Sequence, residues 1–270
     1  MAEQFKEQGG AATMDPSRTM RWMTSKMMSR LVQPQRMEKN RAAVERERSK
    51  AGEPHAVEYF HQVEDGYSQL AAQALQALAE RYDITLKCHL VSGPMGKNSA
   101  EPELLLRLSR YDAFHVAPEY GLEFPQHDHE PDAAMVRQAS EILAALDDAG
   151  FISHAADVGR ALWTGNAEAL HSLERQLGRA STEQLAKRIE QGNARRHTLQ
   201  HYSGAMFYYG KEWYWGVDRL YHLEERLAAL DADRRAEESA LYPRPGIDAG
   251  PLRDNGSLTL EVYPSLRSPY

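Results

Sequence analysis

Thiol chemistry in this 270-residue chain is limited by a single cysteine, Cys88. One cysteine can form neither an internal disulfide nor the CxxC pair of a redox centre. Cys88 lies in the apolar run 84–91, where a free cysteine is usually buried and unreactive. The sequence therefore argues against a thiol–disulfide oxidoreductase.

Metal and phosphate chemistry have little support. His127 and His129 form an HxH pattern with Asp128 and Glu130, but no third ligand follows at a defined spacing. The sequence contains no P-loop, GxGxxG, GxSxG or HExxH motif. We expect no metal site.

Asp65 directly precedes a helical pattern. Two interpretations stay open: it caps the helix, or it acts as a general base. The aromatic run 207–215 is a second candidate, as a ligand platform. Alternate residues of a hairpin must face the core, however, so we expect these aromatic side chains mainly to pack there.

The elements that position these residues follow from hydrophobic spacing. Strand-like runs at 57–63 and 84–91 flank a helical pattern at 67–82, and a crossover helix implies a parallel pair. Further helices are predicted at 104–114, 133–149, 153–162, 167–177 and 182–199. A hairpin at 205–209 and 212–215 and an amphipathic helix at 218–230 follow. This order predicts an α/β thioredoxin-like fold with a large all-helical insertion.

The predicted domain organisation has four parts. They are an N-terminal disordered and amphipathic helical arm (1–55), a discontinuous thioredoxin-like domain (56–94 and 202–230), a helical insertion (95–201), and a linker that leads into a possible second unit (231–270). The helix pair at 17–50 is expected to break near Pro34. It either binds a partner or an anionic surface, or packs on the domain.

Four stretches resemble the DsbA-like family that includes 2-hydroxychromene-2-carboxylate isomerases and kappa-class glutathione transferases. They are VEYFHQVEDGYSQLAAQAL (57–75), RYDAFHVAPEYGLEFP (110–125), GRALW (159–163) and GAMFYYGKEWYWGVDRLYHLEERL (204–227). The resemblance spans about 57 to 230, and its last stretch is the most specific. It implies a glutathione-dependent isomerase or transferase lineage, with glutathione as the cofactor.

Three departures from the family pattern put that activity in doubt. Asp65 stands where the family has its catalytic Ser or Cys, and Gly66 stands where a Pro follows. Met206 stands near the family's cis-Pro. The resemblance therefore implies a degenerate site in this domain. The alternative is a non-catalytic binding or scaffold domain that docks a partner through 17–50 or the hairpin.

The resemblance also implies a set of contacts to substrate or glutathione. They are Tyr67, Lys97, Asn98, Ala205, Met206, Trp215, Asp218 and Arg219. Asp218 either pairs with the amino end of glutathione, or caps a helix while Arg219 forms a salt bridge. Lys97 and Asn98 either contact glutathione or form a solvated turn.

The end of the chain resembles its first strand. LEVYPSLRSPY (260–270) aligns with VEYFHQVEDGY (57–67), and it carries the family's Ser-Pro-Tyr corner from Ser268. We infer that this is the start of a second thioredoxin-like unit of a tandem protein, in which Ser268 would be catalytic. Two alternatives stay open: the tail is a remnant of such a unit, or the similarity arose by chance, since only two of eleven residues are identical.

Charge and hydropathy set the expected partners. The net charge of −7 argues against general nucleic-acid binding, although 18–50 carries +7. No run reaches the ~20 apolar residues of a membrane span, and no signal peptide precedes the arm. We expect a cytoplasmic protein with a small-molecule ligand, and a homodimer stays open.

Overall fold

The computed structural model describes residues 17–31, 33–93, 102–126, 130–246, 259 and 261. Residues Val44–Pro245 form one compact unit, and α1 with the first part of α2 belongs to another. α1 (Arg18–Leu31) and α2 (Pro34–Ala51) are separated as predicted, because proline favours the first position of a helix. The predicted N-terminal start (1–16), Lys97, Asn98 and Ser268 lie outside the described residues.

The larger unit is built on one four-stranded sheet with the strand order β2-β1-β3-β4. β1 (His55–His61) pairs in parallel with β2 (Ile84–Leu90), and α3 (Gly66–Arg81) connects them. β3 (Met206–Tyr209) runs antiparallel to β1 and to β4 (Glu212–Trp215). This is the thioredoxin order, so the predicted fold class is confirmed.

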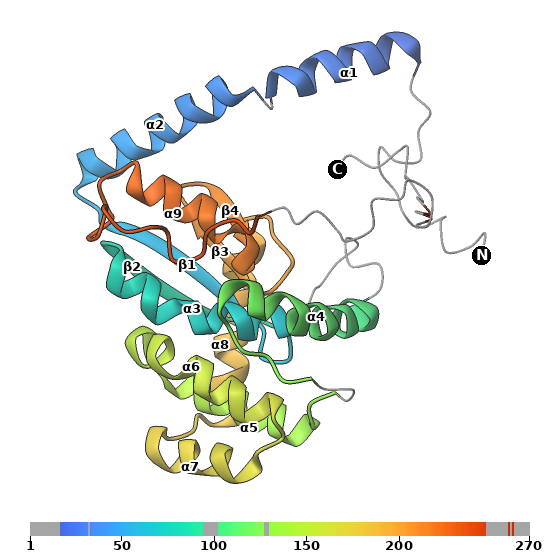
Figure 1. Ribbon diagram of the computed structural model, residues 1–270, viewed down its shortest axis with the longest axis vertical. Coiled ribbons are helices and arrows are strands. Elements are labelled where there is room, and N and C mark those ends of the chain that lie inside the picture. Colours follow the sequence, from blue (N-terminus) through green and yellow to red (C-terminus); the bar gives the residue numbers. More distant parts are fainter. Residues whose placement is uncertain are drawn as a thin grey trace. The chain divides into compact units, whose positions relative to one another are not determined.

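The helical insertion lies between β2 and β3 in the sequence. It contains α4 (Pro102–Val116), η2 (Ala117–Tyr120), α5 (Ala133–Ala145), α6 (Asp148–Trp163), α7 (Ala167–Leu177) and α8 (Thr182–Thr198). α6 packs on α3 and β2, and α5 and α7 pack on α6 (Figure 1). A thioredoxin fold with such an insertion is the DsbA-like form. None of the helices in the described ranges is both long and apolar enough to cross a membrane.

The predicted end of the helix that begins at Ala133 is wrong. The sequence pattern places a helix over 133–149 and a break at Gly150, but α5 ends at Ala145. Asp147 caps α6 by accepting a hydrogen bond from the Gly150 N–H at 2.8 Å. The side-chain cap at Asp147 therefore starts the new helix before the glycine is reached.

The core lies between one face of the sheet and helices α3, α6 and α9 (Leu220–Ala228). Val57 and Tyr59 of β1 are fully buried there. The amphipathic pattern predicted for the closing helix puts Leu220, Leu223, Leu227 and Leu230 on one face. The first three are fully buried, whereas Leu230 follows α9 and is only partly buried. A short helical turn, η3 (Val217–Arg219), precedes α9, so the closing helix begins later than predicted.

The hairpin aromatics alternate between the two faces of the sheet. Phe207, Tyr209 and Tyr214 are at most 4% exposed and belong to the core, which confirms the predicted packing. Trp215 is 44% exposed. The hairpin therefore contributes both a packed face and an accessible tryptophan.

Residues 231–242 are part of the domain and not the linker that their composition suggests. Asp233 pairs with Arg81, and their side chains are only 6% and 3% exposed. The backbone N–H groups of Leu241 and Tyr242 donate to the carboxylate of Glu224, each at 2.9 Å. Polar composition indicates a linker only when the polar groups lack partners in the fold, and here they have them.

Gly192 allows α8 to lie against the end of β2. A Cβ atom at this position would be 2.0 Å from the backbone oxygen of Leu90, a distance that no side chain tolerates. A Gly192→Ala substitution should therefore push α8 away from the sheet. We expect the free energy of unfolding to fall by about 1–3 kcal/mol, as in other overpacked interiors, despite the better helix propensity of alanine.

Urea denaturation checks this expectation, with Gln191→Ala as the matched control on the exposed side of the same helix. That control should change stability by no more than about 0.5 kcal/mol. A Gly192→Ala protein as stable as the parent would show that α8 does not need this close approach.

Candidate functional site

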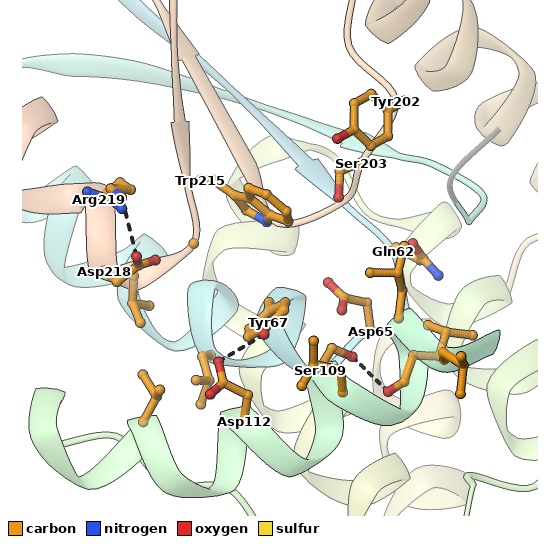
Figure 2. A pocket seen from close by; sticks show the side chains of 18 residues that line it. Gln62, Asp65, Tyr67, Ser109, Asp112, Tyr202, Ser203, Trp215, Asp218 and Arg219 are labelled. Carbon is orange, nitrogen blue, oxygen red and sulfur yellow. Dashed lines mark hydrogen bonds and ion pairs between the residues drawn. The ribbon is translucent and has the colours of Figure 1, made fainter. Parts of the chain in front are cut away.

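A cavity of about 670 Å³ opens where α3 begins, and we call it the α3 cavity. Its walls come from α3, α4, the 202–203 segment and the turn after β4 (Figure 2). This volume is in the range of small-molecule pockets. The cavity lies entirely within the larger unit.

Asp65 caps α3 at the inner end of the cavity. Its carboxylate accepts hydrogen bonds from the Ser68 N–H at 3.0 Å and the Ser68 hydroxyl at 2.9 Å. Only 7% of Asp65 is exposed, and burial raises the pKa of its carboxyl group, although the hydrogen bonds from Ser68 oppose this shift. The helix end that would otherwise attract an anion is thus occupied by the protein's own carboxylate.

Gly66 brings α4 close to the start of α3. Its N–H donates to the Ser109 hydroxyl at 3.3 Å, and that hydroxyl donates to the backbone oxygen of Leu106. A Cβ at residue 66 would be 2.7 Å from the Ser109 backbone oxygen. The glycine therefore sets how α4 forms one wall of the cavity.

Among the residues that the structure describes, three carboxylates and one guanidinium group line the cavity. The Tyr67 hydroxyl donates to Asp112 at 2.9 Å, and burial and this contact raise the pKa of Tyr67. Asp218 lies 3.4 Å from Arg219, and partial burial raises the pKa of Asp218 (Figure 2). The cavity therefore has an excess of negative charge, which favours a positively charged group on a ligand.

Another part of the wall is apolar and accessible. Leu104, Leu105 and Leu108 of α4 are 54%, 40% and 53% exposed, and all three line the cavity together with Trp215. Apolar side chains of this size are usually buried unless they contact a ligand or partner. The cavity is thus amphipathic, with acidic groups near α3 and η3 and leucines along α4.

The structure brings together five of the predicted site residues. Asp65, Tyr67, Trp215, Asp218 and Arg219 all line the α3 cavity. Their roles are still predictions, since a shared cavity does not assign a contact to any ligand.

Ala205 and Met206 are placed differently. Both are buried, and neither lines the cavity. The Ala205 N–H donates to the Ser68 hydroxyl, and its carbonyl accepts from the Gly216 N–H at 2.8 Å. No peptide bond in the described ranges is cis. The backbone of residue 205 is thus already paired within the protein.

Ser109 and Asp112 of α4 were missed by the sequence analysis, as were Tyr202 and Ser203. The sequence analysis predicted a helix over 104–114 and a family resemblance over 110–125, but it gave neither stretch a role in the site. A polar Asp112 one helical turn after Leu108 was the available signal, but spacing alone does not tell which helix faces α3.

Cys88 is not among the residues that line the cavity. Cys88 is buried as predicted, and burial raises the pKa of its thiol. Residues 127–129 lie outside the described ranges. Within those ranges no group of three His, Cys, Asp or Glu side chains is arranged to hold a metal.

The ionisation of Asp65 should make the stability of the folded protein depend on pH. A buried carboxyl whose pKa is raised in the folded state favours the protonated form, so stability falls as pH rises from 3.8 through the folded value. Asp65→Asn should remove this fall while keeping a good helix cap, whereas Asp65→Ala should lose about 1 kcal/mol of stability at neutral pH.

Urea denaturation of the three proteins between acidic and neutral pH measures both effects. The stability of Asp65→Asn relative to the parent should improve as pH rises. A constant difference across this range would mean that Asp65 is not desolvated in the folded protein.

Neither a protein-family model nor a curated protein matches this chain. Several solved structures are similar to it. One is a 2-hydroxychromene-2-carboxylate isomerase, with a TM-score of 0.49 and 19% identity over 68% of this chain and 100% of the isomerase. Another is the cytosolic disulfide reductase DsbM from Pseudomonas aeruginosa, with a TM-score of 0.45 and 18% identity over 65% and 97%. DsbM with GSH gives a TM-score of 0.42 at the same identity and coverage. These likenesses concern the fold alone.

Proposed function

We propose that residues 44–245 form a ligand-binding domain of the glutathione-dependent isomerase and transferase lineage that has lost thiol chemistry. Its ligand is a small amphipathic molecule with an ammonium group, held in the α3 cavity. The observation that carries this proposal is the Asp65 carboxylate at the start of α3. A carboxylate there repels a thiolate, which the same helix end would otherwise stabilise.

Glutathione is the first ligand to test, and it fits the cavity only in part. Its ammonium group is suited to Asp218, which is 54% exposed at the cavity wall. Its sulfur would lie beside Asp65, whose carboxylate already accepts the hydrogen bond of the Ser68 N–H. Bound glutathione would therefore keep its thiol protonated.

A second candidate is an isomerase that uses Asp65 as a general base. The raised pKa of the Asp65 carboxyl favours this candidate, because a base is most effective when its pKa is close to the working pH. Asp65→Asn would abolish such an activity, whereas it would leave ligand binding in place.

The proposal is tested by calorimetric titration of the full chain with glutathione and with S-methylglutathione. We expect both to bind with similar affinity, because the thiol is not engaged. Asp218→Asn should weaken the binding of both compounds by about ten-fold, which is equivalent to about 1.4 kcal/mol. Asp157→Asn is the matched control, since Asp157 is 50% exposed and is not among the cavity residues.

Two results would overturn the proposal. Ultraviolet absorbance of a bound thiolate at neutral pH, or binding that is lost when the sulfur is methylated, would show that the cavity activates the thiol. No binding of either compound to a folded chain would favour the scaffold alternative. A cytoplasmic location, a homodimer and a second unit that begins at residue 260 and contains Ser268 stay predictions.

A further inference from the structure

The apolar side chains of α1 are exposed. Met20, Met23 and Met27 are 52%, 60% and 56% exposed, and Trp22 is 61% exposed. Helices of globular proteins usually bury their apolar side chains against the core. The exposure of α1 therefore requires an explanation of its own.

The three methionines form one stripe along the helix. They are spaced by three and then four residues, so they fall on the same face, as residues at these separations do in any α-helix. We call Met20, Met23 and Met27 the methionine stripe. Trp22 lies outside this stripe, with the Lys26 ammonium 4.6 Å from the centre of its ring.

The charge of α1 has one sign. The helix contains four basic residues and no acidic residue. Subtracting this +4 from the chain's net charge of −7 leaves −11 on the remainder, so the positive charge is concentrated where the apolar stripe is exposed. α2 differs, because it contains Glu38, Glu45 and Glu47 among its basic residues.

We propose that α1 binds to the surface of an anionic lipid bilayer. In this arrangement the methionine stripe enters the boundary between headgroups and acyl chains, while Lys26 and Arg30, which flank the stripe, contact anionic headgroups. Helices that lie in the membrane interface combine these two features. With 14 residues, α1 is too short to span the bilayer.

A bilayer fits these features better than other anionic partners. Nucleic acid would attract the basic side chains, but it has no apolar phase to cover the methionine stripe. A lipid interface provides both the charge and the apolar region. An anionic inner leaflet would also be accessible to a cytoplasmic protein.

The test is co-sedimentation of the full chain with vesicles. One set is phosphatidylcholine alone, and the other contains about a third phosphatidylserine, a fraction that gives a strongly negative surface. We expect at least ten-fold tighter binding to the anionic vesicles, and weaker binding as salt is raised. Substituting the stripe as Met20→Ser, Met23→Ser and Met27→Ser should weaken binding at least ten-fold while keeping every charge.

Met37→Ser is the matched control, because Met37 is an exposed methionine of α2 (44%). It should change binding less than two-fold. Circular dichroism of each variant should match the parent, since the stripe lies outside the larger unit.

Three outcomes would overturn the proposal: no binding to anionic vesicles, equal binding to both vesicle sets, or full binding by the stripe variant. A random-sequence DNA duplex is the competing probe. Binding to the duplex that is tighter than binding to vesicles, and that is unchanged in the stripe variant, would identify α1 as a nucleic-acid contact instead.

Discussion

Replacing Arg81 with alanine is expected to lower the free energy of unfolding by about 3–5 kcal/mol, because the substitution leaves a buried carboxylate without its partner. Arg81 forms two hydrogen bonds to the Asp233 carboxylate, at 3.1 and 3.0 Å. It also donates to the backbone oxygens of Glu238 and Ser239. One guanidinium group thus holds residues 233–239 against the end of α3.

The matched control is Arg160→Ala. Arg160 also forms an ion pair with an aspartate, Asp157 at 2.9 Å, but both side chains are about half exposed. Exposed pairs contribute little, so this control should change stability by no more than about 1 kcal/mol. Urea denaturation compares the two variants.

A double variant separates loss of the pair from loss of packing. Arg81→Ala with Asp233→Ala leaves no unpaired buried charge, so it should be more stable than the sum of the two single effects predicts. Hydrogen exchange should show residues 233–242 opening in Arg81→Ala. A loss no greater than that of Arg160→Ala would mean that this segment does not stabilise the domain.

The second large effect is expected at Glu58 in β1. Its carboxylate accepts two hydrogen bonds from Arg195, at 2.8 and 2.5 Å, and lies 2.9 Å from the His89 ring. Burial opposes ionisation, but the hydrogen bonds from Arg195 and His89 outweigh it and lower the pKa of Glu58 from 4.5 to about 2. Arg195 belongs to α8, so this cluster ties the insertion to the sheet.

The sign of the pH dependence follows from this lowered pKa. The stabilisation is complete above the unfolded pKa of 4.5 and is lost as pH falls from 4.5 towards about 2. A shift of this size corresponds to about 3 kcal/mol. Glu58→Gln mimics the protonated form, so it should reduce stability by up to about 3 kcal/mol at neutral pH.

Urea denaturation at several pH values measures the effect. The difference between Glu58→Gln and the parent should shrink as pH falls below 4.5. Glu130→Gln is the control, because Glu130 is 68% exposed in its pair with Arg110 and should change stability by no more than about 1 kcal/mol. A pH-independent loss in Glu58→Gln would mean that packing, and not ionisation, is responsible.

Local sequence was enough to predict the order of the elements. Short runs of strand-forming residues identify β1, β2 and the hairpin, and helical spacing identifies α3, because these preferences belong to each element by itself. Asp65 was recognised as a possible cap for the same reason, since a cap and its helix are neighbours in the chain. The lone Cys88 excluded an internal redox pair without any structure.

Only the tertiary structure decided how the α3 cavity is built. Ser109 and Asp112 reach the start of α3 because Gly66 lets α4 approach, and these residues are more than forty positions apart. The packing of residues 231–242 depends in the same way on Arg81 and Glu224. Periodicity records which face of a helix is buried, but not which distant side chain it meets, since that choice is made only when the elements pack together.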